Sequence, residues 1–208
     1  MTTVYHHSLF LPWGILLPKS FGLRGASLLR LDQHRNLVLI GGRACGKTSV
    51  GQALAQALQR PFVDLDQVLV AQAGCSIADL VAASGWPEFR RREKEVVARY
   101  AGLSGQVLAP GGGVVLDQEN VRNLREHGLI IWLRADPATL AERLKRDQSS
   151  QEFRPSLTGA DPVTEMARVL AEREPLYRVA AHMIIDTTGL SLDQVVTRIL
   201  AEIGVNQL

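Results

Sequence analysis

The sequence predicts an α/β domain built on a parallel sheet whose two faces are both covered by helices. Three observations support this prediction. Five short apolar runs alternate with amphipathic stretches between residues 36 and 208. Most of these runs are almost continuously apolar, which is typical of strands that are buried on both faces. The first run leads directly into a glycine-rich loop, and a helical pattern follows that loop.

The predicted strands are joined by predicted helices, so they are expected to pair in parallel, because a parallel pair needs a long crossover connection. Val50, Leu54 and Leu58 repeat every four residues and indicate an amphipathic helix directly after the glycine-rich loop. Near the end of the chain, Ser191 and Gln194 form a capping-box pattern that predicts the start of the last helix. The predicted strands span residues 37–40, 61–66, 106–110, 129–133 and 182–187.

One domain of ordinary size accounts for most of the 208 residues. We expect this domain to span residues 36–208, with residues 1–35 forming a poorly ordered amino-terminal extension. The apolar stretch at residues 8–18 is too short to span a bilayer, and Pro12 and Gly14 interrupt it. No Lys or Arg precedes the stretch, which argues against a signal peptide. A membrane partner is therefore not expected.

The charge balance of the chain bears on the class of molecule that it binds. The chain has 23 Lys and Arg residues against 21 Asp and Glu residues, a formal net charge of +2. A nucleic-acid binder usually carries a strong basic excess, so no nucleic-acid partner is expected. Cys45 and Cys75 lack the spacing of metal ligands and are too few for a disulfide framework. We therefore expect a cytoplasmic protein.

The segment "GGRACGKT", from Gly41 to Thr48, matches the P-loop pattern G-x-x-x-x-G-K-[ST] and lies between a predicted strand and a predicted helix. Glycines let backbone N–H groups surround a phosphate chain, and the helix places its positive end at the same point. Lys47 can then reach the β- and γ-phosphates, and the Thr48 hydroxyl can ligate Mg²⁺. A tight turn with a solvated lysine is the alternative. The strand–helix context favours a nucleoside triphosphate site, in which Cys45 is a tolerated small residue.

The second predicted strand ends in "DLD". Asp64 and Asp66 are two residues apart, so on a strand both point to one face, at the carboxyl end where ligands bind in open α/β sheets. One carboxylate could hold the water shell of Mg²⁺ while the other accepts a proton from an attacking hydroxyl. The alternative is a pair of solvated acids at a strand end. The neighbouring P-loop favours the catalytic interpretation.

The segment "GWPEFRRREKEVV" carries three consecutive arginines on a predicted helix whose apolar positions are Phe89, Val96 and Val97. A solvated helix face is the ordinary explanation for such a run. However, Arg90 and Glu93 are three residues apart, so Glu93 could orient an arginine that binds a substrate carboxylate. Three glycines in "PGGGVV" then follow the third strand, and this number suggests a ligand that lies against bare backbone.

These motifs, in this order, resemble the shikimate kinase family. The resemblance rests on the GKT P-loop, "FVDLD", "EFRRRE", the GGG turn, "RPSL" and "REPLY", and it covers residues 36–204. The wording "GGRACGKTSVG" and the longer "EFRPSLTG" segment are similar to the second enterobacterial-type isoenzyme. The resemblance implies a three-layer P-loop fold of the nucleoside monophosphate kinase type, with a five-stranded parallel sheet in the order 2-3-1-4-5. It also implies a mobile lid, which the polar segment at residues 146–159 suits.

The implied reaction is the ATP-dependent phosphorylation of the 3-hydroxyl of shikimate, a step of chorismate and aromatic amino-acid biosynthesis, by a Mg²⁺-dependent monomer. The implied catalytic residues are Asp66 as base, Lys47, and Arg154 from the lid. Thr48 and Asp64 are expected on the metal side. Shikimate is expected to contact Asp66, Arg90, Gly111, Gly112, Gly113 and Arg173. ATP is expected to contact Gly41, Gly42, Arg43, Ala44, Cys45, Gly46, Lys47, Thr48, Ser49, Arg154 and Arg143, with Arg146 the alternative to Arg143 for stacking on adenine.

Two departures from the family pattern and two rival functions remain. The amino-terminal extension is not part of the usual enzyme, and regulation is one role open to it. Pro110 precedes the glycine triplet where a small or hydroxyl residue is expected, so one backbone donor is missing there. A kinase of another small molecule, such as gluconate, would share the P-loop but not the combined arginine pair and GGG turn. A non-catalytic regulatory domain of this family would be expected to lose Asp66, Lys47 or Arg154, and all three are present.

Overall fold

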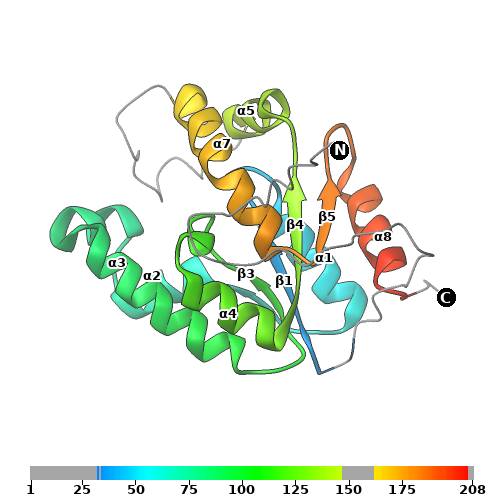
Figure 1. Cartoon of the computed structure of the whole chain (residues 1–208), viewed down its shortest axis with the longest axis horizontal. Helices are drawn as coiled ribbons and strands as arrows, with labels where there is room; N and C mark the ends of the chain where they lie inside the picture. Colours follow the sequence, from blue (N-terminus) through cyan, green and yellow to red (C-terminus); the bar gives the residue numbers. More distant parts are fainter. Residues whose placement is uncertain (1–31, 33, 147–161, 206–208) are drawn as a thin grey trace, which may run out of the picture.

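A five-stranded parallel sheet with the strand order β2-β3-β1-β4-β5 forms the centre of the protein (Figure 1). The structure, a computed structural model, describes residues 32, 34–146 and 162–205. The predicted strand order is therefore confirmed, and so is the parallel direction of every pairing. The strands are β1 (Asn36–Ile40), β2 (Phe62–Asp64), β3 (Val107–Ala109), β4 (Gly128–Arg134) and β5 (Met183–Asp186).

The sheet is buried on both faces, as its continuous apolar runs predicted. In β1, Leu37 and Leu39 pack into one hydrophobic cluster, whereas Val38 and Ile40 pack into a second cluster on the opposite face. All four side chains are at most 1% exposed. Because successive side chains of a strand point to opposite faces, this division shows that each face of β1 has its own core.

Helices supply the other side of each core. Residues of α1 and α8 contribute to the first cluster, and residues of α3 and α4 contribute to the second. Figure 1 accordingly shows α3 and α4 on one side of the sheet and α1 and α8 on the other. The helices are α1 (Lys47–Leu58), α2 (Leu65–Ala73), α3 (Ile77–Ala101), α4 (Gln118–His127), α5 (Pro137–Arg146), α7 (Pro162–Ala180) and α8 (Leu192–Glu202), with a short 3₁₀ helix at Val114–Leu116.

Helix α3 consists of two helical parts that meet at Gly85. The backbone of Gly85 has φ 78° and ψ 169°, which is not helical, and Pro87 follows directly after the break. Proline is well placed there, because the first turn of a helix needs no N–H donor from it. The arginine-rich part of α3 therefore begins as a new helix, with Phe89, Val96 and Val97 buried as predicted.

The predicted start and end of the last helix are also confirmed. The Ser191 side chain accepts a hydrogen bond from the Gln194 N–H, and the Gln194 side chain accepts one from the Ser191 N–H. Gly204 adopts a positive φ of 74° just after α8. Among the described helices, no single one has the length and apolar composition of a membrane span, and only the pair α2 and α3, bent by 89°, reaches them together. Residues 1–31 and 33 of the expected extension lie outside the described residues.

Candidate active site

The P-loop connects β1 to α1 at the carboxyl end of the sheet. Its two pattern glycines are conformational requirements, since Gly41 has φ 146° and Gly46 has φ 94°. A Cβ atom at Gly41 would lie 2.5 Å from the Leu133 carbonyl oxygen and 2.7 Å from the Cys45 sulfur, so no side chain fits there. Gly46 is the residue that precedes α1, and the free N–H groups of the first helical turn therefore face the loop. This arrangement is a typical phosphate-binding nest.

The ammonium group of Lys47 is held inside this loop. The side chain is buried, and its Nζ donates hydrogen bonds to the carbonyl oxygens of Gly41 (3.0 Å) and Gly42 (3.1 Å). The same Nζ lies 3.9 Å from the Cys45 sulfur, which is itself buried. The loop thus places a positive charge and a helix amino terminus close together, which favours binding of a polyphosphate.

Thr48 and Asp64 meet at the next position of the site. The Thr48 hydroxyl donates to Asp64 Oδ2 at 3.1 Å, while Asp64 Oδ1 accepts the backbone N–H groups of Asp66 (3.1 Å) and Gln67 (3.3 Å). The described residues contain no cluster of three His, Cys, Asp or Glu side chains that would form an all-protein metal cage. Mg²⁺ in kinase sites binds through one or two protein oxygens together with phosphates and water. A hydroxyl and a carboxylate side by side fit that requirement.

The strand position predicted for Asp66 is wrong. Strand β2 ends at Asp64, which caps the amino terminus of α2, and Asp66 lies in the first turn of that helix. The hydrogen bonds from the Asp66 and Gln67 N–H groups to Asp64 are the physical reason, because an aspartate at this position stabilises a helix start. Both carboxylates nevertheless line the same cleft, so their expected proximity to the P-loop holds.

Arg90 and Glu93 form an ion pair on the inner face of α3. Arg90 Nη1 lies 2.5 Å from Glu93 Oε2, and the side chain of Glu93 is 6% exposed. The guanidinium of Arg90 also lies over the rings of Phe89 (5.0 Å) and Trp86 (5.6 Å). Burial raises the pKa of Glu93, and this effect is opposed by the positive charges of Arg90 and Arg173. Glu93 therefore pairs with Arg90 and is influenced by the charge of Arg173, the two arginines assigned to a carboxylate.

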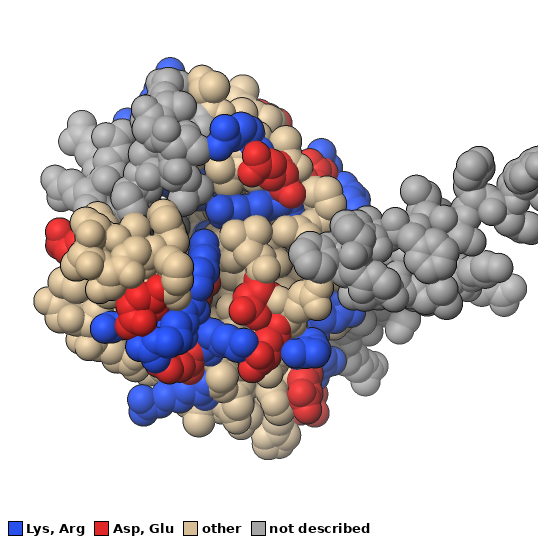
Figure 2. Space-filling view, turned by 60° about the vertical axis from the view of Figure 1, so that its left-hand side comes forward, with Lys and Arg blue, Asp and Glu red and all other residues tan. Residues whose placement is uncertain are grey.

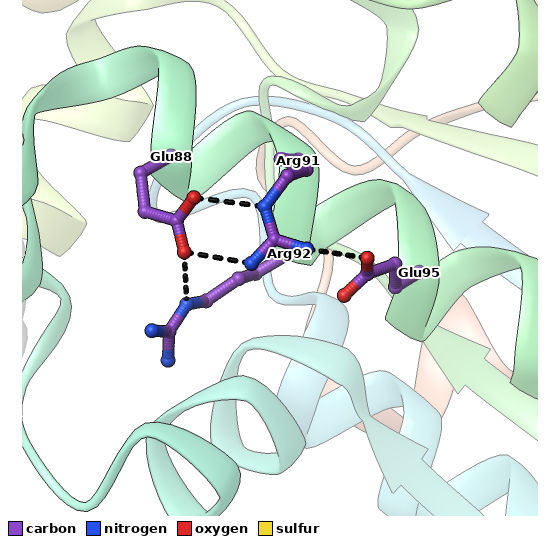
Figure 3. A network of polar contacts seen from close by, with 4 residues as sticks. All are labelled: Glu88, Arg91, Arg92 and Glu95. Carbon is purple, nitrogen blue, oxygen red and sulfur yellow. Dashed lines mark hydrogen bonds and ion pairs between the residues drawn. The ribbon is translucent and has the colours of Figure 1, made fainter.

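The other two arginines of the triplet point to the outer face of α3. Figure 3 shows Arg91 paired with Glu88 and Glu95, and Arg92 paired with Glu88. The space-filling view shows basic side chains lying beside acidic ones over much of the surface that it presents (Figure 2). Only Arg90 of the three lies against the glycine triplet. The pairing of Arg91 and Arg92 agrees with a solvated helix face, and the binding of a carboxylate by Arg90 stays a prediction.

The glycine triplet brings these groups together. A Cβ atom at Gly111 would lie 2.7 Å from Asp66 Oδ1 and 3.2 Å from Glu93 Oε1. A Cβ atom at Gly113 would overlap the guanidinium of Arg90. The triplet therefore lies directly against Asp66, Glu93 and Arg90, and side chains at these positions would fill that space. Pro110, the departure noted in the sequence, is buried and lines the cleft before the triplet.

Gly112 and Arg173 complete this side of the site. Arg173 is half-buried on α7, and its charge acts on Glu93. Four residues later, the hydroxyl of Tyr177 donates to the carbonyl oxygen of Gly112 at 2.6 Å. The sequence assigned no role to Tyr177, although it is the last residue of "REPLY". A fully buried tyrosine needs a partner for its hydroxyl, but the pattern does not identify that partner.

A cleft of about 870 Å³ extends from the P-loop and the two aspartates to the far end of the sheet. Arg143 of α5 lines its far end and donates to Thr187, through Nη1 to the hydroxyl (3.1 Å) and through Nη2 to the carbonyl oxygen (2.9 Å). The sequence did not identify Thr187, Leu190 or Val195, which line the same end of the cleft. They belong to the connection after β5 and to α8, where no motif marks them.

Two predicted residues cannot be placed. Arg154 and the expected lid segment after Arg146 lie outside the described residues. Arg146 ends α5, but its side chain is likewise not described, so the choice between Arg143 and Arg146 for adenine stays a prediction. The remaining P-loop positions, Arg43, Ala44 and Ser49, line the cleft with the residues already named.

Comparison with known proteins identifies the family. The family model described as shikimate kinase matches residues 43–204. The chain belongs to the shikimate kinase family. A shikimate kinase of Symbiobacterium thermophilum is 48% identical over 168 residues, which is 81% of this chain and 95% of that protein. Shikimate kinase 2 of Dickeya chrysanthemi is 44% identical over 152 residues, which is 73% of this chain and 87% of that protein. The family resemblance is thus confirmed, and relatives named shikimate kinase 2 are among the similar proteins.

Solved structures agree with this family assignment. A shikimate kinase of Acinetobacter baumannii, solved in complex with shikimate, is similar with a TM-score of 0.77 and 31% identity, over 84% of this chain and 96% of that one. A gluconokinase of Sinorhizobium meliloti has a TM-score of 0.52 and 19% identity, over 83% of this chain and 93% of that one. The second likeness shows a shared fold alone.

Proposed function

We propose that this protein carries out the reaction of its family, in which ATP phosphorylates the 3-hydroxyl of shikimate to give shikimate 3-phosphate and ADP. The observation that carries the proposal is the arrangement of one site with two halves. A buried P-loop lysine lies on one side, and Asp66 and the Arg90–Glu93 pair lie against the glycine triplet on the other. A phosphoryl donor and a small anionic acceptor fit these two halves.

The nucleotide half supplies charge and position. The N–H groups of the P-loop and of the first turn of α1 bind the phosphates, and Lys47 moves from the Gly41 and Gly42 carbonyls to the β- and γ-phosphates. Thr48 and Asp64 would hold Mg²⁺, which neutralises phosphate charge when it is bound. By the family resemblance, Arg143 or Arg146 is expected to contact adenine, and Arg154 is expected to contact the phosphates. Phosphoryl transfer needs little more than such positioning and charge stabilisation.

The acceptor half supplies recognition and the base. Arg90 and Arg173 bind the carboxylate of shikimate, and a guanidinium is suited to this because it can donate two parallel hydrogen bonds. Asp66 accepts the proton of the 3-hydroxyl as that oxygen bonds to the γ-phosphorus and the bond to the departing ADP breaks. Gly111, Gly112 and Gly113 allow the acceptor to lie against the backbone between these groups. We also propose that the enzyme is a cytoplasmic monomer, since its two small-molecule substrates do not call for a macromolecular partner.

The experiment that tests this function measures ADP release from ATP and Mg²⁺ by the purified full-length chain, with and without shikimate. We expect release to depend strongly on shikimate and the product to carry phosphate on the 3-hydroxyl. Gluconate serves as the control acceptor and should not stimulate release. A folded protein that binds ATP but shows no stimulation by shikimate would contradict the proposal and would favour another acceptor or a non-catalytic role.

A further inference from the structure

Helix α7 contacts several parts of the active site through one of its faces. Leu170, Arg173 and Tyr177 are spaced by three and four residues, so they lie on the same side of the helix. A Cβ atom at Gly42 of the P-loop would overlap the Leu170 side chain, so this end of the face touches the P-loop backbone. Arg173 acts on Glu93, and Tyr177 binds Gly112. The helix therefore connects the nucleotide half and the acceptor half.

The Tyr177 hydroxyl is held in one place. The residue has no exposed surface, and its ring stacks on Trp132 of β4 with the ring centroids 5.7 Å apart and the planes inclined by 26°. A ring packed in this way fixes the direction of its hydroxyl, since tyrosine has only two side-chain torsions before it. The hydrogen bond to the Gly112 carbonyl oxygen is short, 2.6 Å. Tyr177 is thus a rigid support that touches the triplet but not the cleft.

The carbonyl oxygen of Gly112 belongs to the planar peptide group that joins Gly112 to Gly113. Holding this oxygen therefore fixes the orientation of the whole peptide plane. Gly113 lies directly against the guanidinium of Arg90, with no room for a Cβ atom between them. The position of Arg90 consequently depends on a backbone segment that Tyr177 holds. A glycine-rich segment has no side chains of its own to restrain it, so this restraint comes from outside.

We propose that Tyr177 is a positioning residue that sets the relative placement of Arg90 and Arg173 for the acceptor carboxylate. Arg173 lies four residues before Tyr177 on the same helix, and Arg90 lies against the peptide that the Tyr177 hydroxyl holds. One hydrogen bond therefore ties the helix that carries one arginine to the loop that supports the other. This inference rests on the proposed function, because it assumes that the two arginines bind the carboxylate of shikimate.

The nucleotide half is expected to depend much less on this hydrogen bond. Gly112 lies next to the P-loop, where a Cβ atom on it would be 3.2 Å from the Gly41 carbonyl oxygen. That carbonyl, however, follows directly from strand β1 and accepts a hydrogen bond from Lys47. The P-loop is thus held by its own strand and lysine. A change at Tyr177 should affect the acceptor and leave ATP binding nearly unchanged.

The test compares Tyr177→Phe with Tyr100→Phe in the full-length enzyme. Tyr177→Phe removes only the hydroxyl and leaves the Gly112 carbonyl without this donor, so we expect the KM for shikimate to rise roughly tenfold. The KM for ATP and kcat should change less than about twofold. Tyr100 is the matched control, because it lies in the last turn of α3 beside Arg99, away from the triplet. An unchanged shikimate KM in Tyr177→Phe would overturn the inference.

A second acceptor separates positioning from a general loosening of the fold. The primary alcohol that corresponds to shikimate has no carboxylate, so the arginine pair cannot bind it as it binds shikimate. The loss of kcat/KM caused by Tyr177→Phe should therefore largely disappear with this acceptor. An equal loss with both acceptors would show that Tyr177 acts only on stability and would overturn the proposal.

A rescue variant covers the case in which Tyr177→Phe does not fold. 4-Aminophenylalanine incorporated at the same position provides a donor of similar shape and should restore the wild-type KM for shikimate. Failure of this rescue in a folded protein would overturn the inference.

Turnover by the wild-type enzyme separates the inference from the proposed function. If the wild-type enzyme shows no turnover of shikimate, the proposed function fails, and the inference fails with it. Normal wild-type turnover with a normal Tyr177→Phe variant refutes the positioning role alone.

Discussion

The two faces of the arginine-rich half of α3 carry the same residue types in opposite surroundings. On the inner face, Arg90 and Glu93 have side-chain exposures of 28% and 6%, and on the outer face Arg91 and Glu88 have 55% and 26%. Burial raises the pKa of Glu93 despite its arginine neighbours. Hydrogen bonds from Arg91 and Arg92 lower the pKa of Glu88 to about 2. The same spacing of three residues thus gives pKa shifts of opposite sign.

This difference shows that hydrogen-bonding capacity for a ligand is left on the inner face of α3. The outer network is satisfied by its own members, as both oxygens of Glu88 accept hydrogen bonds from arginines (Figure 3). On the inner face, Glu93 Oε1 has no hydrogen-bond partner within the described part of the chain, although it is buried. A buried polar atom without a partner costs stability. Such a cost is common where a ligand completes the set of contacts.

The largest effect is expected from Asp66→Asn, which removes a carboxylate next to the inner pair. If Asp66 is the general base, kcat should fall by about 10²–10⁴-fold while ATP still binds, because the amide cannot accept the proton. Asp79→Asn, at the exposed start of α3, is the matched control and should retain turnover. The measurement is steady-state ADP release together with ATP binding by calorimetry. Near-normal turnover of Asp66→Asn would exclude its role as base.

A comparison of Arg90→Ala with Arg91→Ala tests directly whether the inner and outer faces of α3 have different roles. We expect Arg90→Ala to weaken shikimate binding by about 2–5 kcal/mol, since a desolvated charged contact is lost. Arg173→Ala should behave in the same way. Arg91→Ala should change the shikimate KM less than twofold, because its partners Glu88 and Glu95 are on the outer face. Similar effects for Arg90 and Arg91 on the KM would contradict the assignment of inner and outer roles.

Glu93→Gln should change stability in the opposite direction from most polar substitutions. A carboxyl group whose pKa is raised by folding adds stability below its unfolded pKa, and this stability is lost as the pH rises through the folded pKa. At pH 7 the ionised Glu93 is therefore disfavoured in the folded state, and the variant should melt a few degrees above the wild type. The difference should disappear at acidic pH, where Glu93 is protonated.

Melting temperatures of the wild type and Glu93→Gln between pH 4 and pH 8 check this expectation. The shikimate KM of both proteins at pH 7 is measured as well. The shikimate KM of Glu93→Gln should rise several-fold, because a neutral amide orients Arg90 less firmly than a carboxylate does. A melting temperature that falls at pH 7 would show that the ion pair with Arg90 outweighs burial at this position.

The smallest effect is expected from Glu88→Gln on the outer face. The lowered pKa of Glu88 means that its contribution is present above the unfolded pKa and is lost as the pH falls toward 2. Solvent and salt screen an exposed pair, so the melting temperature at pH 7 should change by less than about 2 °C. The shikimate KM should stay unchanged. A large change in either quantity would show that the outer network supports the site.

The sequence by itself determined the architecture and the phosphate-binding loop of the site. Strand order followed from the family resemblance, and approximate strand positions followed from apolar runs, which the structure buries between two hydrophobic clusters. The P-loop is equally local, because Gly41, Gly46, Lys47 and Thr48 lie within eight consecutive residues and their geometry is set by backbone conformation. Short-range features of this kind can be read from spacing alone.

Only the tertiary structure decided how the acceptor half is assembled. The sequence placed Asp66 on a strand, whereas hydrogen bonds to Asp64 begin a helix there and turn Asp66 toward Gly111. It singled out Arg90 of "RRR" by its spacing from Glu93, but the packing of α3 shows that Arg91 and Arg92 turn away from that side, since a helix distributes three consecutive residues around its axis. The contact between Tyr177 and Gly112 joins residues 65 positions apart. Such contacts depend on how α3, α7 and the triplet pack together, and no local pattern records that packing.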